Sequence, residues 1–220
     1  RYDLFLSPAD DAEADVGWGG LGMFSLMAAG HRGTGDGSGA ALMDAYSAAD
    51  IGWIVPRTLY GSSDGPQGVP LNPADASAWR IDVPGSEGRE YFLLETRGNA
   101  GTFDAAVPDD RLLIYHVDET VPEDSQSSSN PEQRHLRVRL VEADGLNDVT
   151  DARNLGTVDD LFPSSAGAVT WTPETDPASD GYDDATGAAL WDLTPLSPGL
   201  TCNWDVPAVA VDVTTAIVPD

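Results

Sequence analysis

The chain has 220 residues, with 37 acidic side chains, 11 basic ones and a formal net charge of -26. All of the basic residues are arginine, so lysine is absent. Binding to a polyanion or to an anionic membrane surface needs a basic face, so this charge excludes a nucleic-acid partner and a membrane-surface function. No apolar run is long enough to cross a bilayer, so no membrane insertion is expected.

The acidic composition has two interpretations. A lysine-free acidic surface suits a high-salt environment, because salt screens the self-repulsion of the carboxylates. Carboxylates are also calcium ligands, and a calcium-binding protein is the second interpretation. The single cysteine, Cys202, leaves no internal disulfide and is expected to be a buried thiol.

The predicted elements begin with irregular structure over the first forty residues, where glycine-rich stretches flank an apolar island at residues 23–29. Residues 40–51 are the best helix candidate, because apolar side chains recur on one face and Gly52 follows as a stop signal. From Trp53 onward the pattern is typical of short strands bounded by Gly, Pro, Asp or Asn. The predicted strands are residues 53–55, 78–83, 90–96, 112–117, 136–142, 169–172 and 209–213. The Ser- and Pro-rich residues 121–133 are predicted to be a solvent loop.

These elements predict an α+β protein that is mainly β. A glycine-rich loop and one helix precede a twisted antiparallel β-rich region with long loops. We expect residues 1–56 to form the loop and helix, and residues 57–220 to form the β-rich remainder of the same domain. In the strand at residues 136–142, apolar side chains alternate with Arg137 and Arg139, which indicates a half-buried strand with its arginines outward.

A set of short strings follows in order along the chain, at residues 1–3, 22–30, 45–53, 90–97, 112–118, 141–145 and 160–163. Residues 90–97 read EYFLLETR and residues 112–118 read LLIYHVD. In this order and at compatible spacings, the set resembles the immune inhibitor A family of zinc metalloproteases, metallopeptidase family six. Two positions depart from that family: Phe24 replaces a tryptophan, and Asp50 stands where a basic or polar residue is common.

The resemblance implies the C-terminal part of the catalytic domain of a secreted zinc endopeptidase, which hydrolyses peptide bonds in proteins or peptides through zinc-activated water. The family's H-E-x-x-H helix lies upstream of the first string, and this chain contains no such motif. His31, His116 and His135 are too far apart for the i, i+4 pair that binds one zinc. The zinc ligands are therefore expected in the upstream half of the same catalytic domain, and the isolated fragment is expected to be inactive.

Two residues of this chain are implicated near the zinc by the resemblance. Met27 matches the methionine of a turn beneath the zinc ligands, where a soft side chain packs against imidazole rings. Residues 28–30 are small and allow a sharp bend, while an ordinary core methionine is the alternative. Asp3 lies near the region of the family's third zinc ligand, and a surface aspartate is the alternative there.

A polar network is predicted around the strand at residues 112–117. His116 and Asp118 are two residues apart, so their side chains share one face of the strand. Glu95 or Arg97 from a neighbouring strand could complete the network, and a metal site is the alternative.

The segment from Glu142 to Asp160 is rich in short oxygen-bearing side chains around Gly145 and Gly156. Calcium takes about six to eight oxygen ligands from flexible loops, so this segment could hold one ion, although it lacks EF-hand spacing. The candidate calcium ligands are Asp144, Asn147, Asp151, Asn154, Asp159 and Asp160. A solvated acidic loop is the alternative.

Two non-catalytic functions remain open. One is an acidic, calcium-stabilised extracellular β domain derived from such a protease, and the other is a similar domain unrelated to proteases. The sequence upstream of residue 1 discriminates, since only a protease needs a helix with paired histidines there. No G-x-S-x-G motif, P-loop or post-strand G-x-G-x-x-G supports another catalytic class.

Overall fold

The computed structural model describes residues 20–33, 39–62, 78–98, 103–104, 107, 110–122, 135–151, 153–165, 167–195 and 200–208. These residues contain a single α-helix, α1 (Ala45–Asp50), short 3₁₀ helices at Gly22–Phe24, Ala29–Arg32 and Val158–Asp160, and two β-sheets. The predicted α+β, mainly β class is therefore confirmed. A search of the described helices for one with the length and hydropathy of a membrane span found none.

The larger sheet has the strand order β1-β3-β4-β5-β6. Its strands are β1 (Arg57–Thr58), β3 (Trp79–Asp82), β4 (Glu90–Arg97), β5 (Arg111–Asp118) and β6 (Val138–Leu140). Strand β1 runs parallel to β3, and the other neighbours are antiparallel. The smaller sheet has the order β2-β8-β7, with β2 (Gly61–Ser62), β7 (Ala189–Pro195) and β8 (Leu200–Val206) all antiparallel.

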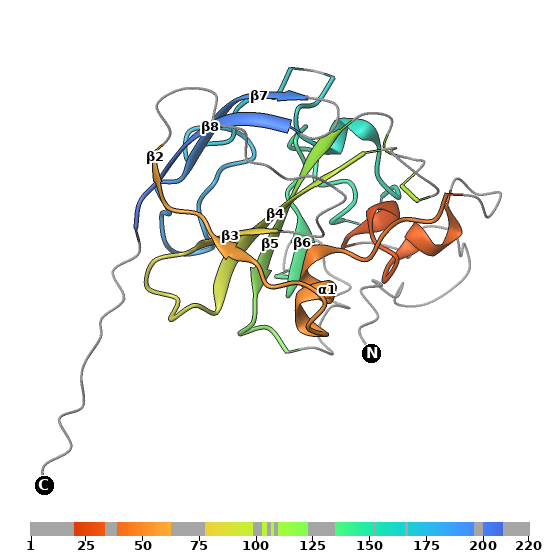
Figure 1. Cartoon of the computed structure of the whole chain (residues 1–220), viewed down its shortest axis with the longest axis horizontal. Coiled ribbons are helices and arrows are strands. Elements are labelled where there is room, and N and C mark those ends of the chain that lie inside the picture. The colour runs from red at the N-terminus through yellow and green to blue at the C-terminus, as the bar shows by residue number, and fades with distance from the viewer. Residues whose placement is uncertain are drawn as a thin grey trace, which may run out of the picture.

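Three layers result, as Figure 1 shows. Strands β7 and β8 (blue) lie on one side of the larger sheet, while α1 and the 3₁₀ helices near the N-terminus (orange and red) lie on the other. One apolar cluster joins Phe92 and Ile114 of the larger sheet to Leu190 and the buried Cys202 of the smaller sheet. A second cluster lies on the opposite face, where Leu93, Leu113 and Tyr115 meet Phe24 and Tyr46.

The central pair β4–β5 explains this arrangement. The two strands pair over their full eight-residue length, from Glu90 opposite Asp118 to Arg97 opposite Arg111. Because side chains alternate along a strand, even-numbered residues of both strands face the smaller sheet and odd-numbered residues face α1. Both faces are covered, so the apolar runs in EYFLLETR and LLIYHVD are almost continuous.

Several predicted elements differ from those observed. Helix α1 is shorter than the predicted 40–51, because Asp44 caps it: its Oδ1 accepts a hydrogen bond of 2.8 Å from the Ser47 amide. The predicted strands at 53–55 and 169–172 are wrong, since among the described residues the first pairs with no strand and the second forms an isolated bridge at Trp171.

Strands β7 and β8 were not predicted. Their hairpin contains a bulge between Trp191 and Thr194, and Asp192 there adopts a φ of 56°, so the alternation of apolar and polar residues is interrupted. The predicted strand at 209–213 and most of the predicted loop at 121–133 lie outside the described residues.

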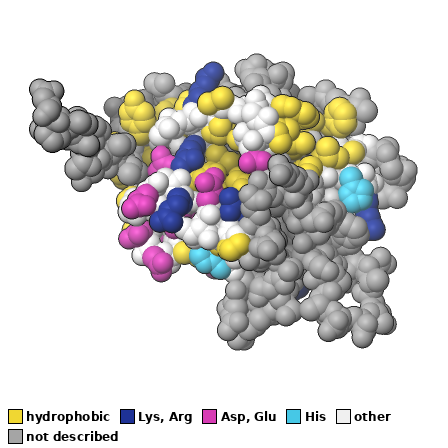
Figure 2. All heavy atoms as spheres, turned by 90° about the horizontal axis from the view of Figure 1, so that it is seen from below, with side chains coloured by type: hydrophobic (Ala, Val, Ile, Leu, Met, Phe, Trp, Pro, Cys, Tyr) yellow, Lys and Arg dark blue, Asp and Glu magenta, His cyan; other side chains and the backbone are white. Residues whose placement is uncertain are grey.

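The described surface carries both apolar and charged areas. Trp53, Val55 and Tyr60, in the segment after α1, are each more than half exposed. Figure 2 shows hydrophobic side chains gathered on one part of the face seen from below, beside a part where arginine and acidic side chains are interleaved. On the described part of this face, the arginines therefore form no continuous basic area.

Buried Arg97 at the end of β4 links the sheet to the N-terminal layer. Its side chain is 2% exposed and forms an ion pair of 2.6 Å with Glu95 Oε1. The guanidinium also donates to the Phe24 carbonyl at 2.5 Å and to the Met43 carbonyl at 3.2 Å. The Tyr115 hydroxyl, 3.3 Å from Nη2, donates in turn to Glu95.

Replacing Arg97 with methionine is expected to destabilise the protein by about 3–5 kcal/mol, because Glu95 and the buried Asp104 lose their cation. Urea denaturation at neutral pH measures this change. Arg89→Met is the matched control, since Arg89 is half-exposed and lies 3.5 Å from exposed Glu87. Its cost should stay within about 0.5 kcal/mol, and equal costs for the two variants would contradict the linking role of Arg97.

Candidate functional site

The segment around Met27 forms a tight bend. The amides of Ala28 and Gly30 both donate to the Ser25 carbonyl, at 3.0 and 2.9 Å. The Met27 amide donates to Ser25 Oγ at 3.0 Å, and this hydroxyl donates to Asp44 Oδ2 at 2.5 Å. The bend is thus closed by its own backbone and tied to the cap residue of α1.

Gly30 is the position at which a side chain cannot be accommodated. A Cβ there would lie 2.5 Å from the Ala41 Cβ, 2.5 Å from the Ser25 carbonyl oxygen and 2.7 Å from the Met23 carbonyl oxygen. Met27 itself is half-buried and packs against the cluster on this side of the sheet. The sharp turn predicted from small residues is therefore present, and Met27 also contributes to the core.

The histidines of the described residues do not come together as a set of metal ligands. The His31 Nδ1 atom lies 2.8 Å from the Ala28 carbonyl, whereas His116 and His135 each pair with a carboxylate elsewhere. In the described part of the chain, the group of His, Cys, Asp and Glu side chains close enough to share a metal contains no histidine. Asp3 lies outside the described residues.

The predicted single polar network is wrong, because its members lie on opposite faces of the β4–β5 pair. Glu95 and Arg97 are odd-numbered and face the N-terminal layer, where they bond to each other. His116 and Asp118 face the other way: His116 Nε2 lies 2.7 Å from Glu90 Oε1. Sequence spacing placed His116 and Asp118 on one face correctly but could not supply the register against β4.

Asp118 belongs to a second pair on the same face as His116. Its Oδ2 lies 2.7 Å from Nε2 of the half-exposed His135, and its Oδ1 accepts hydrogen bonds from Thr120. Burial raises the pKa of Asp118, but the hydrogen bonds from Thr120 and the nearby His135 lower it overall.

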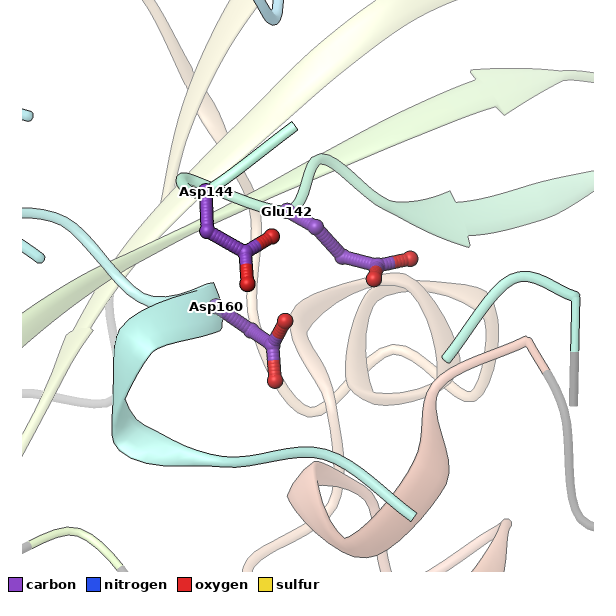
Figure 3. A group of neighbouring side chains, drawn as sticks. All are labelled: Glu142, Asp144 and Asp160. Carbon is purple, nitrogen blue, oxygen red and sulfur yellow. The ribbon is translucent and has the colours of Figure 1, made fainter. Parts of the chain in front are cut away.

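The acidic segment brings three carboxylates together. Carboxylate oxygens of Glu142, Asp144 and Asp160 lie within 4.8 Å of one another, and Figure 3 shows these side chains converging from two parts of the chain. Glu142 and Asp144 follow β6, while Asp160 ends the 3₁₀ helix Val158–Asp160. The hydrogen bond from the Ala143 amide to the Asp160 carbonyl, 2.9 Å long, holds the two parts side by side.

The electrostatics of this cluster favour a cation. Burial raises the pKa of Glu142, although its carboxylate accepts from the amides of Thr150 and Val149 at 2.9 and 3.0 Å. The pKa of Asp160 is raised by burial and by the nearby charges of Asp144 and Asp148. Concentrated, partly buried negative charge of this kind fits a hard cation that prefers oxygen ligands.

Only part of the predicted calcium ligand set takes part. Asp144 and Asp160 are in the cluster, and Glu142 from the same acidic segment joins them. The other four candidates have different partners: Asn147 bonds the Gly145 carbonyl, Asp151 pairs with Arg153, Asn154 accepts from the Gly156 amide, and Asp159 accepts from the Ser165 amide. The composition of the chain identified the acidic segment. It could not show that a capping box between Thr157 and Asp160 orients the Asp160 carboxylate.

Comparisons with protein-family models, with curated proteins and with solved structures found no match to this chain.

Gly30→Ala is expected to destabilise the protein by at least about 3 kcal/mol, because two of the three close contacts of the new Cβ are with backbone oxygens that cannot move aside. Gly52→Ala is the matched control: its Cβ meets nothing within 4 Å, and only its φ of 78° costs about 1 kcal/mol. Chemical denaturation of both variants compares the costs. A Gly30→Ala variant as stable as Gly52→Ala would show that the bend is not closely packed.

Proposed function

We propose that this chain is the distal part of the catalytic domain of a secreted zinc-dependent endopeptidase of the immune inhibitor A type. The observation that carries the proposal is that the strings resembling that family lie against one another in space. Arg97, in the string at 90–97, bonds the Phe24 carbonyl in the string at 22–30 and the Met43 carbonyl just before the string at 45–53.

Further contacts join the remaining described strings. Leu112, in the string at 112–118, forms a β-bridge with Phe162 in the string at 160–163. The string at 141–145 reaches the same place through the bond from the Ala143 amide to the Asp160 carbonyl. If all of these strings are related to the family, they should lie together in one domain although they are far apart in the sequence. A chance match of a single string would not require such contacts.

In this proposal, zinc would activate water for peptide-bond hydrolysis, with its ligands and the general base in the upstream half of the domain. In this proposal the described histidines are not zinc ligands, and the described residues would support the catalytic site. Ser25, Gly30 and Asp44 hold the bend that carries Met27, and Arg97 fixes this bend to the sheet. The substrates would be proteins or peptides, and the acidic composition favours a saline extracellular environment.

The activity test compares two preparations. The 220-residue chain alone is expected not to cleave casein, whereas the chain joined to its upstream sequence should cleave it and should lose activity in o-phenanthroline. Activity that survives an excess of this chelator would contradict the proposal. An upstream sequence without paired histidines on a helix would instead favour the non-catalytic, protease-derived β domain.

We also propose that the cluster of Glu142, Asp144 and Asp160 binds calcium. The specific observation in its favour is the convergence of three carboxylates, two of them buried, with raised pKa values at Glu142 and Asp160. Calcium would neutralise this charge, and the remaining ligands would be carbonyl oxygens or water.

Calcium is expected to raise the melting temperature of the chain. At a concentration about tenfold above the dissociation constant, the stabilisation should be about 1.4 kcal/mol, or roughly 3–6 °C for a chain of this size. Asp144→Asn should abolish most of the shift, because it removes a ligand charge and keeps the acceptor for the Leu146 amide. Asp151→Asn lies outside the cluster and should retain the shift, so equal shifts in both variants would contradict the site.

A further inference from the structure

Residues 179–187 form a closed loop, here named the Tyr182 loop. Thr186 Oγ1 donates to the Ser179 carbonyl at 2.7 Å, and the Thr186 amide donates to Asp180 Oδ1 at 3.2 Å. The Gly181 amide donates to the Asp184 carbonyl at 2.9 Å. These bonds close the loop on itself between its buried ends at Ser179 and Thr186.

The Tyr182 loop is attached to the even-numbered face of the larger sheet. The Tyr182 amide donates to Glu90 Oε1 at 2.7 Å. The Tyr182 ring stacks on His116 with a centroid distance of 4.3 Å and lies 3.6 Å from the ring centroid of His135. The contact is close at Gly181, where a Cβ would lie 2.7 Å from a Val83 methyl group and 2.8 Å from Glu90 Oε1.

His116 is held in its neutral form by this arrangement. Its Nδ1 lies 3.2 Å from Arg139 Nη2, and because a guanidinium can only donate, Nδ1 must accept that hydrogen bond. The imidazole proton is therefore on Nε2 and is donated to Glu90 Oε1 at 2.7 Å. Both ring nitrogens of His116 therefore have hydrogen-bond partners. A second proton, on Nδ1, would face the Arg139 guanidinium, which has no acceptor for it.

Protonation of His116 would set a cationic N–H against the Arg139 guanidinium. Burial and the nearby charges of Arg139 and His135 lower the pKa of His116 to about 4, although Glu90 opposes this shift. Burial raises the pKa of Glu90, but its hydrogen bonds from His116 and the Tyr182 amide lower it overall.

The charged and titratable groups around His116 therefore come from every neighbouring element. They are Glu90 on β4, Asp118 on β5, Arg139 on β6, His135 before β6 and Tyr182 on the loop. Arg139 also lies 5.6 Å from the Tyr182 ring centroid, so one arginine faces both the histidine and the aromatic ring that stacks on it.

We propose that the Tyr182 loop is an acid-released strap: protonation of His116 breaks its contact with Arg139, and the loop leaves the sheet while both sheets stay folded. Release would expose Glu90 and the rings of His116 and Phe92, which stack at 4.4 Å on the face beneath the loop. The neutral histidine acts as the latch.

Proton linkage decides whether acid favours the open or the closed form of the loop. The closed form holds His116 at a pKa of about 4, whereas a solvated histidine titrates near 6.5, so the open form binds more protons between these values. The closed form is therefore fully favoured above pH 6.5 and loses stability as the pH falls toward 4. Because Arg139 stays beside His116 in the folded sheet, the open population at pH 4.5 should have risen by at most on the order of 100-fold relative to pH 7.

Hydrogen exchange of the full 220-residue chain tests the strap. Between pH 7 and pH 4.5, exchange of the Tyr182 amide should accelerate by up to about 100-fold after correction for the intrinsic chemical rate, while amides of β4 and β5 remain protected. Simultaneous loss of protection in β4 and β5 would mean that acid unfolds the whole protein and would overturn the proposal.

Three variants separate the latch from general acid loosening. His116→Gln cannot titrate, and Arg139→Gln allows a protonated histidine to remain beside Glu90, so each should reduce the acid response of the Tyr182 amide by at least about tenfold. Arg137→Gln is the control, because Arg137 bonds Tyr46 and not His116 and should leave the response intact. An undiminished response in both His116→Gln and Arg139→Gln would show that other groups release the loop.

Discussion

The architecture depends on one buried cation. Arg97 sits at the end of β4 with 2% of its side chain exposed, and it donates to carbonyl oxygens of the Met27 bend and of the segment before α1. Carbonyl oxygens removed from water need hydrogen-bond donors, and Arg97 supplies donors to both. A guanidinium with several fixed donors can satisfy them together, and Glu95 balances its charge at 2.6 Å. The N-terminal layer is thus attached by charge-assisted hydrogen bonds as well as by apolar packing.

The β4–β5 pair separates two different chemistries. On its odd-numbered face, Glu95, Arg97 and Tyr115 form a buried network that is fixed by complementary charge. On its even-numbered face, His116 is neutral and lies between an acceptor, Glu90, and a donor, Arg139. In the first network Arg97 keeps its charge because an arginine does not lose its proton, whereas the second network contains a histidine that titrates in mild acid. One strand pair therefore holds the N-terminal layer at any pH through Arg97, and in the proposed strap it holds the Tyr182 loop only while His116 is neutral.

The acidic cluster and the Met27 bend are neighbours in the fold. The loop after Glu142 donates from Val149 and Thr150 to the Glu142 carboxylate, and its backbone accepts from the amides of Gly20 at Val149 and of Met23 at Leu155. Gly156 in the same loop is packed against the Phe24 ring. An ion bound by Glu142, Asp144 and Asp160 would consequently order the loop on which the bend rests. The proposed calcium site and the proposed support for a catalytic zinc would then share one structural element.

The sequence by itself determined the class of the fold, the positions of β3, β4, β5 and β6, and the acidic segment, because these follow from local composition and from the period of apolar residues. It also located the bend at Met27 from a run of small residues. Only the tertiary structure decided the faces. Strand register put Glu95 and Arg97 on one face of the sheet and His116 and Asp118 on the other, a capping box oriented Asp160, and β7 and β8 paired despite a bulge. Register, capping and bulges depend on which segments meet, and that information is spread over contacts distant in the chain, so local patterns could not supply it.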